Sequence, residues 1–277
     1  MRVRTLLIGL LPWTLVLAGC PKDEKEDPLT WAQAKEAVEE STLSDQATSL
    51  VNGTVEISTN FTIGKAVDAA AAELREFIST QLPCAEITLQ NATLAIEYGA
   101  NPGNCTYNGH TYSGTHSVTV SRNDDGDVEV HHTWDALSNT KISVSGTADV
   151  TWSLQDKSRN VVHELTWTRL SDGRQGTGSG NRTQSTLEGG ILEGIRVNGS
   201  RTWEGKSGRW DTAINNVEMR WVDPVPQTGS YVLSTPFDKS LSMSFERVDE
   251  DSIKVTIASG DRSFSFNVNK AGSATSD

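Results

Sequence analysis

The chain has 277 residues, of which 36% are hydrophobic and 22% are charged, and its formal net charge is −12. This acidic balance argues against a nucleic-acid partner, because phosphate backbones need a basic surface. It also argues against adsorption of the chain itself on anionic lipid headgroups. The length is sufficient for one large β domain or two smaller ones.

The N-terminal segment 1–19 has the organisation of an export signal. Arg2 and Arg4 precede an apolar run, 6–18, that is too short to span a bilayer. The segment ends in Leu-Ala-Gly followed by Cys20. This ending resembles the lipobox of bacterial lipoproteins, in which small residues precede a cysteine that is cleaved and lipidated.

The resemblance implies that Cys20 becomes the first residue of the mature chain and carries acyl chains, palmitate among them, that hold the protein to a bilayer. Cleavage would lower the Lys and Arg count from 24 to 22 against 36 Asp and Glu, giving a net charge of −14. Pro21 stands where the well-studied sorting systems place the aspartate that favours inner-membrane retention. We therefore expect a lipid-anchored protein of the cell envelope, at the outer membrane.

Two cysteines remain once Cys20 is lipidated, Cys84 and Cys105. An exported protein meets an oxidising compartment, and no CxxC spacing or Cys/His cluster indicates a metal or redox pair. We predict a Cys84–Cys105 disulfide, which would stabilise the fold by about 3 kcal/mol in the chain-entropy model.

The segment 20–28 is charged and bracketed by prolines, so it reads as a tether. We expect a helical segment over 29–82. Thr30 begins the sequence TWAQ, which matches a capping box, and 63–82 has an apolar stripe at helical spacing, read as a face that packs on the sheet. The stretch 54–62 could form a strand between these two helices.

From Glu86 to about Val268 the hydropathy alternates with a period of two, which indicates an antiparallel β domain over 83–270. Ten to twelve strands separated by short turns predict a mainly β fold: an antiparallel meander, as a single curved sheet, a sandwich or a half-open barrel, with one or two N-terminal helices packed on it. The last residues, 271–277, read as a disordered tail.

The sequence Asp-Asp-Gly at 124–126 predicts a three-residue hairpin loop with Gly126 in the left-handed conformation. Val120 would then face Val130, and Val118 would face His132. The stretch 173–186 breaks the alternation, because it lacks large apolar residues; it is compatible with an edge strand, a bulged strand or a long exposed loop.

Thr-Trp pairs recur in the alternating segments. Tight hairpins would place Trp152 opposite Trp167, across a turn at 156–160, and Trp203 near Trp210. These four tryptophans and two others define one candidate hydrophobic face: Trp134, Trp152, Trp167, Trp203, Trp210 and Trp221.

No catalytic motif or cofactor signature is evident, so we do not expect an enzyme. His116, His132 and His163 occupy positions that fall on the apolar side of their predicted strands. No zinc-ligand spacing accompanies them, so we predict no metal site. The acidic turn 123–127 lacks the twelve-residue calcium pattern and reads as a hairpin. The acidic pair Glu39-Glu40 reads as a solvated helix surface.

Two functions follow from different protein classes. The first is a non-catalytic envelope lipoprotein with a binding or structural role toward an envelope or extracellular partner. The alternative is a carrier that holds a lipid or another hydrophobic ligand in a cupped sheet. The carrier requires a large apolar cavity between the sheet and the helix at 63–82, whereas the first function expects tight packing there.

Overall fold

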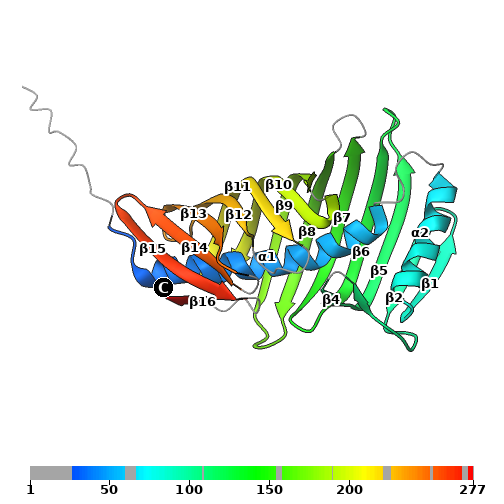
Figure 1. Ribbon diagram of the computed structural model, residues 1–277, viewed down its shortest axis with the longest axis horizontal. Coiled ribbons are helices and arrows are strands. Elements are labelled where there is room, and N and C mark those ends of the chain that lie inside the picture. Colours follow the sequence, from blue (N-terminus) through cyan, green and yellow to red (C-terminus); the bar gives the residue numbers. More distant parts are fainter. Residues whose placement is uncertain are drawn as a thin grey trace, which may run out of the picture.

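The computed structural model describes residues 27–59, 67–107, 109–153, 158–188, 190–220, 226–249, 252–269 and 274–276. Two helices, α1 (Trp31–Thr59) and α2 (Val67–Gln81), precede the strands (Figure 1). The strands are β1 (Ala85–Gln90), β2 (Thr93–Tyr98), β3 (Thr106–Tyr107), β4 (His110–Thr111), β5 (Ser113–Arg122), β6 (Val128–Ser138), β7 (Ile142–Ser153), β8 (Ser158–Arg169), β9 (Gln175–Leu187), β10 (Gly190–Gly205), β11 (Gly208–Arg220), β12 (Thr228–Ser234), β13 (Ser240–Arg247), β14 (Ser252–Ser259), β15 (Arg262–Asn269) and β16 (Ala274–Ser276).

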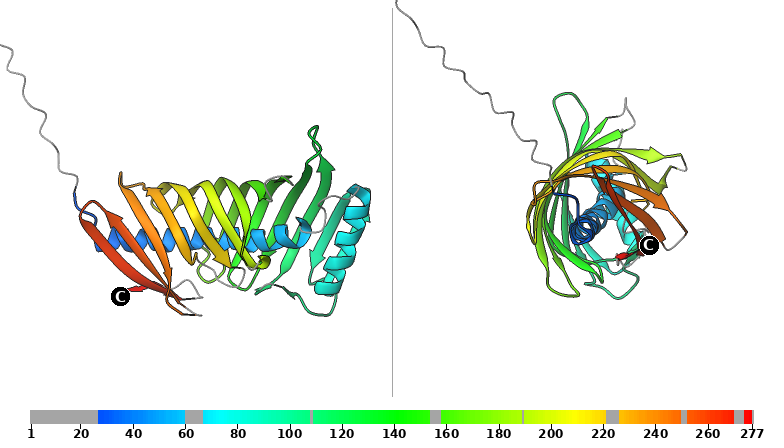
Figure 2. Two further views of the ribbon diagram at one scale, coloured as in Figure 1. Left: turned by 45° about the horizontal axis from the view of Figure 1, so that its top comes forward. Right: turned by 90° about the vertical axis from the view of Figure 1, so that its left-hand side faces the viewer.

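The predicted fold class is confirmed. Fourteen strands form one antiparallel sheet in chain order, and β3 and β4 form a separate hairpin between β2 and β5. The sheet curls along its length but does not close, and α1 lies inside the curl along the long axis (Figures 1 and 2). α2 packs at the β1 end. Within the described residues, no helix is long and apolar enough to cross a membrane.

The N-terminus of α1 carries the predicted capping box. The backbone N–H of Gln33 donates to Thr30 Oγ1 at 3.2 Å, and the backbone N–H of Thr30 donates to Gln33 Oε1 at 3.0 Å. The helix then continues to Thr59, so the strand considered for 54–62 is wrong over 54–59, and the rest of that stretch lies outside the described residues. Burial against the sheet overrides the β-branched residues that favoured a strand there.

The hairpin predictions are confirmed around Gly126, whose φ is +85°: Val120 pairs with Val130, and Val118 with His132. The Cys84–Cys105 disulfide is also present, with 5.3 Å between the Cα atoms. At the other end of the chain, β16 pairs with β15, within the segment expected to be a disordered tail.

The stretch 173–186 is neither an edge strand nor a loop: it forms most of β9, between β8 and β10. Three of its inward positions, 176, 178 and 180, are glycines because large side chains of the neighbouring strands lie across them. A Cβ at Gly176 would lie 2.6 Å from Trp167 Nε1, and one at Gly180 would lie 2.5 Å from His163 Cε1. The missing apolar bulk of β9 is therefore supplied by its neighbours.

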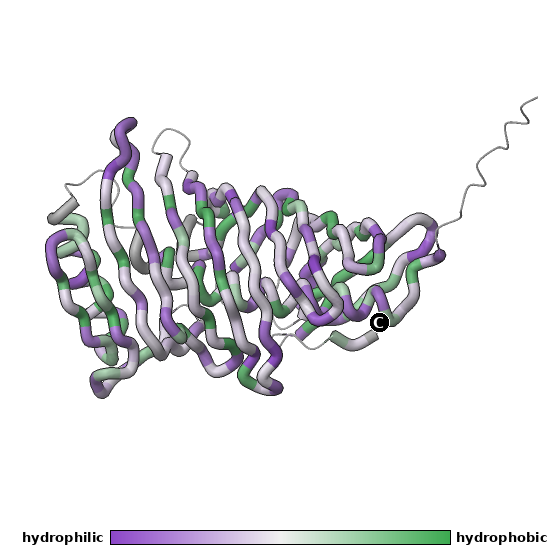
Figure 3. Tube along the Cα trace, turned by 180° about the vertical axis from the view of Figure 1, so that it is seen from behind, coloured by the Kyte–Doolittle hydropathy of each residue, from purple (hydrophilic) through white to green (hydrophobic). Residues whose placement is uncertain are grey.

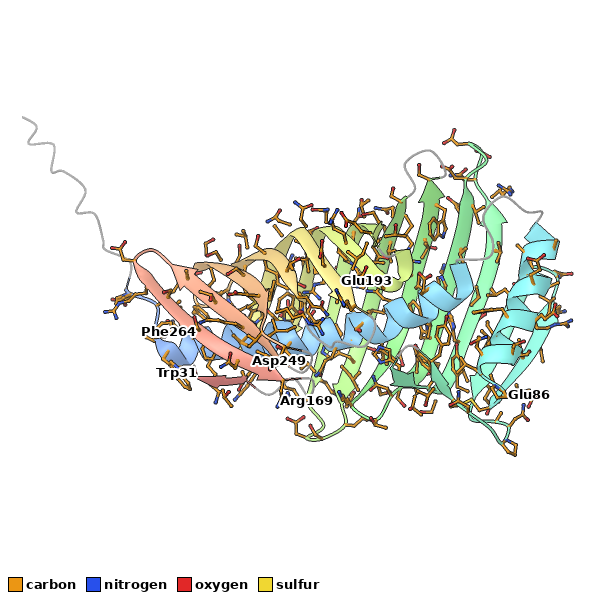
Figure 4. All side chains as sticks on the ribbon, viewed as in Figure 1. Trp31, Glu86, Arg169, Glu193, Asp249 and Phe264 are labelled. Carbon is orange, nitrogen blue, oxygen red and sulfur yellow. A yellow bond between two sulfur atoms is a disulfide. The ribbon has the colours of Figure 1, made fainter. Side chains whose placement is uncertain are left out.

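The alternation of hydropathy separates the two faces of the sheet (Figure 3). The concave face is mostly apolar, and its apolar side chains form one continuous buried cluster with α1, whose Ala47, Leu50 and Val55 are fully buried. The convex face carries Ser, Thr and charged residues. The two ends of the body are marked by Glu86 on β1 and, at the opposite end, by Trp31 beside Phe264 (Figure 4).

Candidate functional site

The candidate hydrophobic face lies on the concave side of the sheet and is covered. Five of its six tryptophans are buried there: Trp134, Trp152, Trp167, Trp203 and Trp210. Trp221 lies outside the described residues. Trp203 and Trp210 face each other in register, with parallel rings 5.9 Å apart, as predicted.

The predicted pairing of Trp152 with Trp167 is wrong. Trp152 lies opposite Arg159, and Trp167 lies opposite Val144, because the β7–β8 hairpin turns earlier and already pairs Ser153 with Ser158. The polar residues after Ser158 resemble a turn in the sequence but belong to β8. We call the concave side of the curled sheet, which holds α1, the trough. Arg159 points into this trough and forms an ion pair there with Glu56 of α1.

One cluster of buried charge joins the middle of α1 to β10. Arg201 Nη1 lies 2.6 Å from Asp45 Oδ1, and the Tyr231 hydroxyl donates to the same oxygen at 2.9 Å. The Arg201 guanidinium also lies over the rings of Trp203 and Tyr231. Burial raises the pKa of Asp45, and the neighbouring Arg201 opposes this rise.

A second cluster lies three helical turns further along α1. Arg159 Nη1 donates to Glu56 Oε2 at 2.9 Å, and Arg159 Nε donates to Gln184 Oε1 at 2.7 Å. The Gln184 amide in turn donates to Asn52 Oδ1 at 3.2 Å. Burial raises the pKa of Glu56, opposed by the charge of Arg159. This chain of contacts fixes the position of the helix relative to β8 and β9.

Between these clusters lies Arg182 of β9, which is fully buried and contacts His163 Nδ1 at 3.2 Å. Burial and then the charge of Arg201 lower the pKa of Arg182 to about 9, so its guanidinium stays charged at neutral pH. Burial and the nearby arginines hold the pKa of His163 well below its ordinary value, so this imidazole is neutral.

The N-terminal part of α1 is joined to the sheet as well. Glu40 forms an ion pair with Arg174 and accepts the backbone N–H of Lys206 at 3.1 Å. The expectation that both Glu39 and Glu40 are solvated is thus wrong for Glu40, which is 1% exposed. Its register on the helix turns it toward the trough, whereas Glu39 faces outward.

The histidines predicted to face inward do so and pack with aromatic rings. His116 Nε2 and His132 Nδ1 are 2.9 Å apart, and both rings stack near Trp134. Burial lowers the pKa of His116 to about 3. In the part of the chain that the structure describes, no group of three or more His, Cys, Asp or Glu side chains could hold a metal ion.

The buried charges are the part of the site that sequence reasoning missed, although two signals were available. Arg159, Arg182 and Arg201 lie at inward-facing positions of the consecutive strands β8, β9 and β10. On α1, Asp45 in the middle of the helix and Glu56 in its C-terminal part lie three helical turns apart, on the same side of the helix. An inward arginine needs an inward carboxylate, and a helix with polar residues on its buried face supplies it.

Comparison with known proteins yields no relative: no protein-family model, no curated protein and no solved structure matches this chain. The site must therefore be interpreted from its own geometry. That geometry is suited to holding a helix in one position, since Glu40, Asp45 and Glu56 of α1 are buried and form ion pairs across the helix–sheet interface.

Proposed function

We propose that this chain is a non-catalytic lipoprotein of the cell envelope, held to the outer membrane through acylated Cys20, whose body is a filled and rigid scaffold. The observation that carries this proposal is the occupation of the trough by α1. The helix contributes fully buried apolar residues and three ion pairs to the interface, involving Glu40, Asp45 and Glu56. A scaffold of this kind presents its convex face to a partner.

The place where the chain enters the body supports the anchoring proposal. Lys239, at the turn between β12 and β13, donates to the backbone carbonyl of Asp27. Asp27, the first described residue, therefore lies at the end of the body that carries β13–β16, away from β1 and α2 (Figures 1 and 2). Acylation of Cys20 would place that end toward the bilayer and the disulfide-linked end away from it.

The anchor is tested by metabolic labelling with palmitate in a bacterium that expresses the full chain. We expect the label in the wild-type protein, which should fractionate with the outer membrane. The substitution Cys20→Ser should remove the label and release the protein, and it leaves every described residue unchanged. A labelled Cys20→Ser protein, or an unlabelled wild type, contradicts the anchor.

The alternative carrier was expected to need a large apolar cavity between the sheet and the helix at 63–82, where Leu74 and Ile78 of α2 are buried in the core cluster shared with the sheet. A ligand held along the curl of the sheet would instead require α1 to leave the trough, which would expose buried charges on both surfaces. Hydrogen exchange of the backbone amides of α1 discriminates the two functions. A filled scaffold predicts that the amides around Leu50 exchange as slowly as those of central strands such as β8. Exchange of the whole helix in seconds, beside a protected sheet, would instead favour the carrier.

A further inference from the structure

A row of eight residues, six of them serine or threonine, crosses the convex face of the sheet. The register places eight residues of successive strands opposite one another, from β1 to β10: Thr88, Ala95, Ser117, Thr133, Thr147, Glu164, Ser179 and Thr202. We call these residues the hydroxyl row. Neighbouring strands lie 4.7–4.9 Å apart, so the row is about 33 Å long.

Three hollows of the convex surface lie along this row. The largest, about 560 Å³, spans β7–β10 and is lined by hydroxyls that include Thr147, Ser179 and Thr202. A second, about 290 Å³, shares Ser179 and Thr202 with it. The third, also about 290 Å³, lies at the β1 end and includes Thr88 and Thr133. The hollows follow one line, so they suit a single extended ligand better than three small ones.

The chemistry of these hollows matches a polyhydroxylated ligand. Serine and threonine hydroxyls both donate and accept hydrogen bonds, as sugar hydroxyls do, and carboxylates accept strongly from them. Two neighbouring cross-strand pairs supply this chemistry across β8, β9 and β10. Thr166 lies opposite Thr177, and the Ser179 and Thr202 hydroxyls are hydrogen-bonded at 3.2 Å.

The charge of the hollows limits the ligand further. Five carboxylates line the largest hollow and the one at the β1 end: Glu86, Glu97, Asp135, Glu164 and Glu204. Arg209 also lines the largest hollow, but its positive charge is paired with Asp211, at 2.9 Å between Nη2 and Oδ1. A polymer rich in phosphate, sulfate or carboxylate groups would be repelled from this surface.

We propose that the hydroxyl row binds one extended chain of a polysaccharide that carries no anionic groups. This inference deepens the envelope role proposed above, since the row lies on the outward face of the scaffold. It does not depend on the lipid anchor, because the row is built entirely from strands β1–β10. Failure of palmitate labelling and failure of glycan binding are therefore separate results.

Binding is tested on the body without its signal and tether, residues 27–277, by isothermal titration. The probes are oligomers of β-1,4-linked N-acetylglucosamine and of β-1,4-linked glucose, each from two to eight units, with oligogalacturonate as the anionic counterpart. We expect affinity to rise with length for at least one neutral series, because longer chains reach more of the row. The anionic series should bind at least about tenfold more weakly.

Ser179 provides the matched variants. Ser179→Lys fills the two hollows that Ser179 lines and lies opposite Glu164, whereas Ser242→Lys makes the same change on β13, on the same face but beyond the row. Ser179→Gln enlarges the side chain without adding a positive charge, so it separates the effect of filling the hollow from the effect of the lysine charge. We expect Ser179→Lys and Ser179→Gln to weaken neutral-glycan binding about tenfold or more, and Ser242→Lys to change it less than about twofold. Unchanged thermal midpoints would show that all three proteins are folded.

Three results would overturn the proposal. The first is failure of every neutral oligomer to bind. The second is binding that the Ser179 and Ser242 variants weaken equally. The third is tighter binding of oligolysine than of any glycan, with the same dependence on Ser179, which would assign the row to cationic peptides.

Discussion

Arg201 Nη1 on β10 lies 2.6 Å from Asp45 Oδ1 in the middle of α1, and both side chains are at most 3% exposed. This ion pair joins two segments separated by more than half of the sheet-forming chain. Because each charge is removed from water, the contact is tolerable only while both partners are present. Its loss provides the first test of how the trough is held.

Asp45→Asn should destabilise the protein by about 3–5 kcal/mol, because it leaves Arg201 buried without its counter-charge. Urea denaturation gives the free energy of unfolding. The matched control is Asp211→Asn, which removes an exposed partner of Arg209 and should cost less than about 1 kcal/mol. Equal losses for the two variants would mean that the buried pair does not hold the helix.

Acid should destabilise the fold below pH 6.5. Burial lowers the pKa of His110 to about 4 and that of His116 to about 3. Between pH 6.5 and those values the unfolded chain binds protons that the folded chain does not, so stability falls with pH. Between pH 7 and 5.5 each such histidine should contribute a loss of about 1 kcal/mol.

Asp45 and Glu56 contribute with the opposite sign, because burial raises their pKa values and the folded state takes up protons first. Unfolding free energies at pH 7 and 5.5 measure the balance, and His116→Phe should reduce the pH dependence. A protein that is more stable at pH 5.5 than at pH 7 would contradict the dominance of the histidines.

Gly180→Ala should destabilise the protein by about 1–3 kcal/mol. The new Cβ would lie 2.5 Å from His163 Cε1, so the imidazole and its contact with Arg182 would have to move. Thr183→Ala, an exposed change on the same strand, should stay within about 0.5 kcal/mol of the wild type. Thermal unfolding of the two variants gives the comparison, and tolerance of Gly180→Ala would exclude close packing across β9.

Removal of the Cys84–Cys105 bridge, which links residues 21 positions apart, should cost about 3 kcal/mol. The double variant Cys84→Ser with Cys105→Ser tests this by urea denaturation. The wild-type body without Cys20 should show no reactive thiol under denaturing conditions without reductant. Two reactive thiols would contradict the disulfide.

The sequence carries enough local information to predict the antiparallel meander, the capping box at Thr30 and the hairpin at Gly126, because period, cap and turn chemistry are short-range. Local sequence does not show which distant residue will contact a polar segment and allow it to be buried. In the sequence Arg159 resembles a turn residue, but in the structure it is buried and paired with Glu56. The glycines of β9 resemble a loop in the sequence, but the ring of Trp167 packs against Gly176 and Gly178. Both errors arise from contacts between residues distant in the chain.

The central claim is that α1 is the permanent occupant of the trough. Native mass spectrometry of the body without Cys20, purified from the periplasm in a detergent-free buffer, tests it most directly. The filled scaffold predicts the mass of the polypeptide alone, with its disulfide intact. A stoichiometric copurifying lipid, with amides of α1 that exchange fast while it is bound and become protected when it is extracted, would contradict the filled trough and favour the carrier.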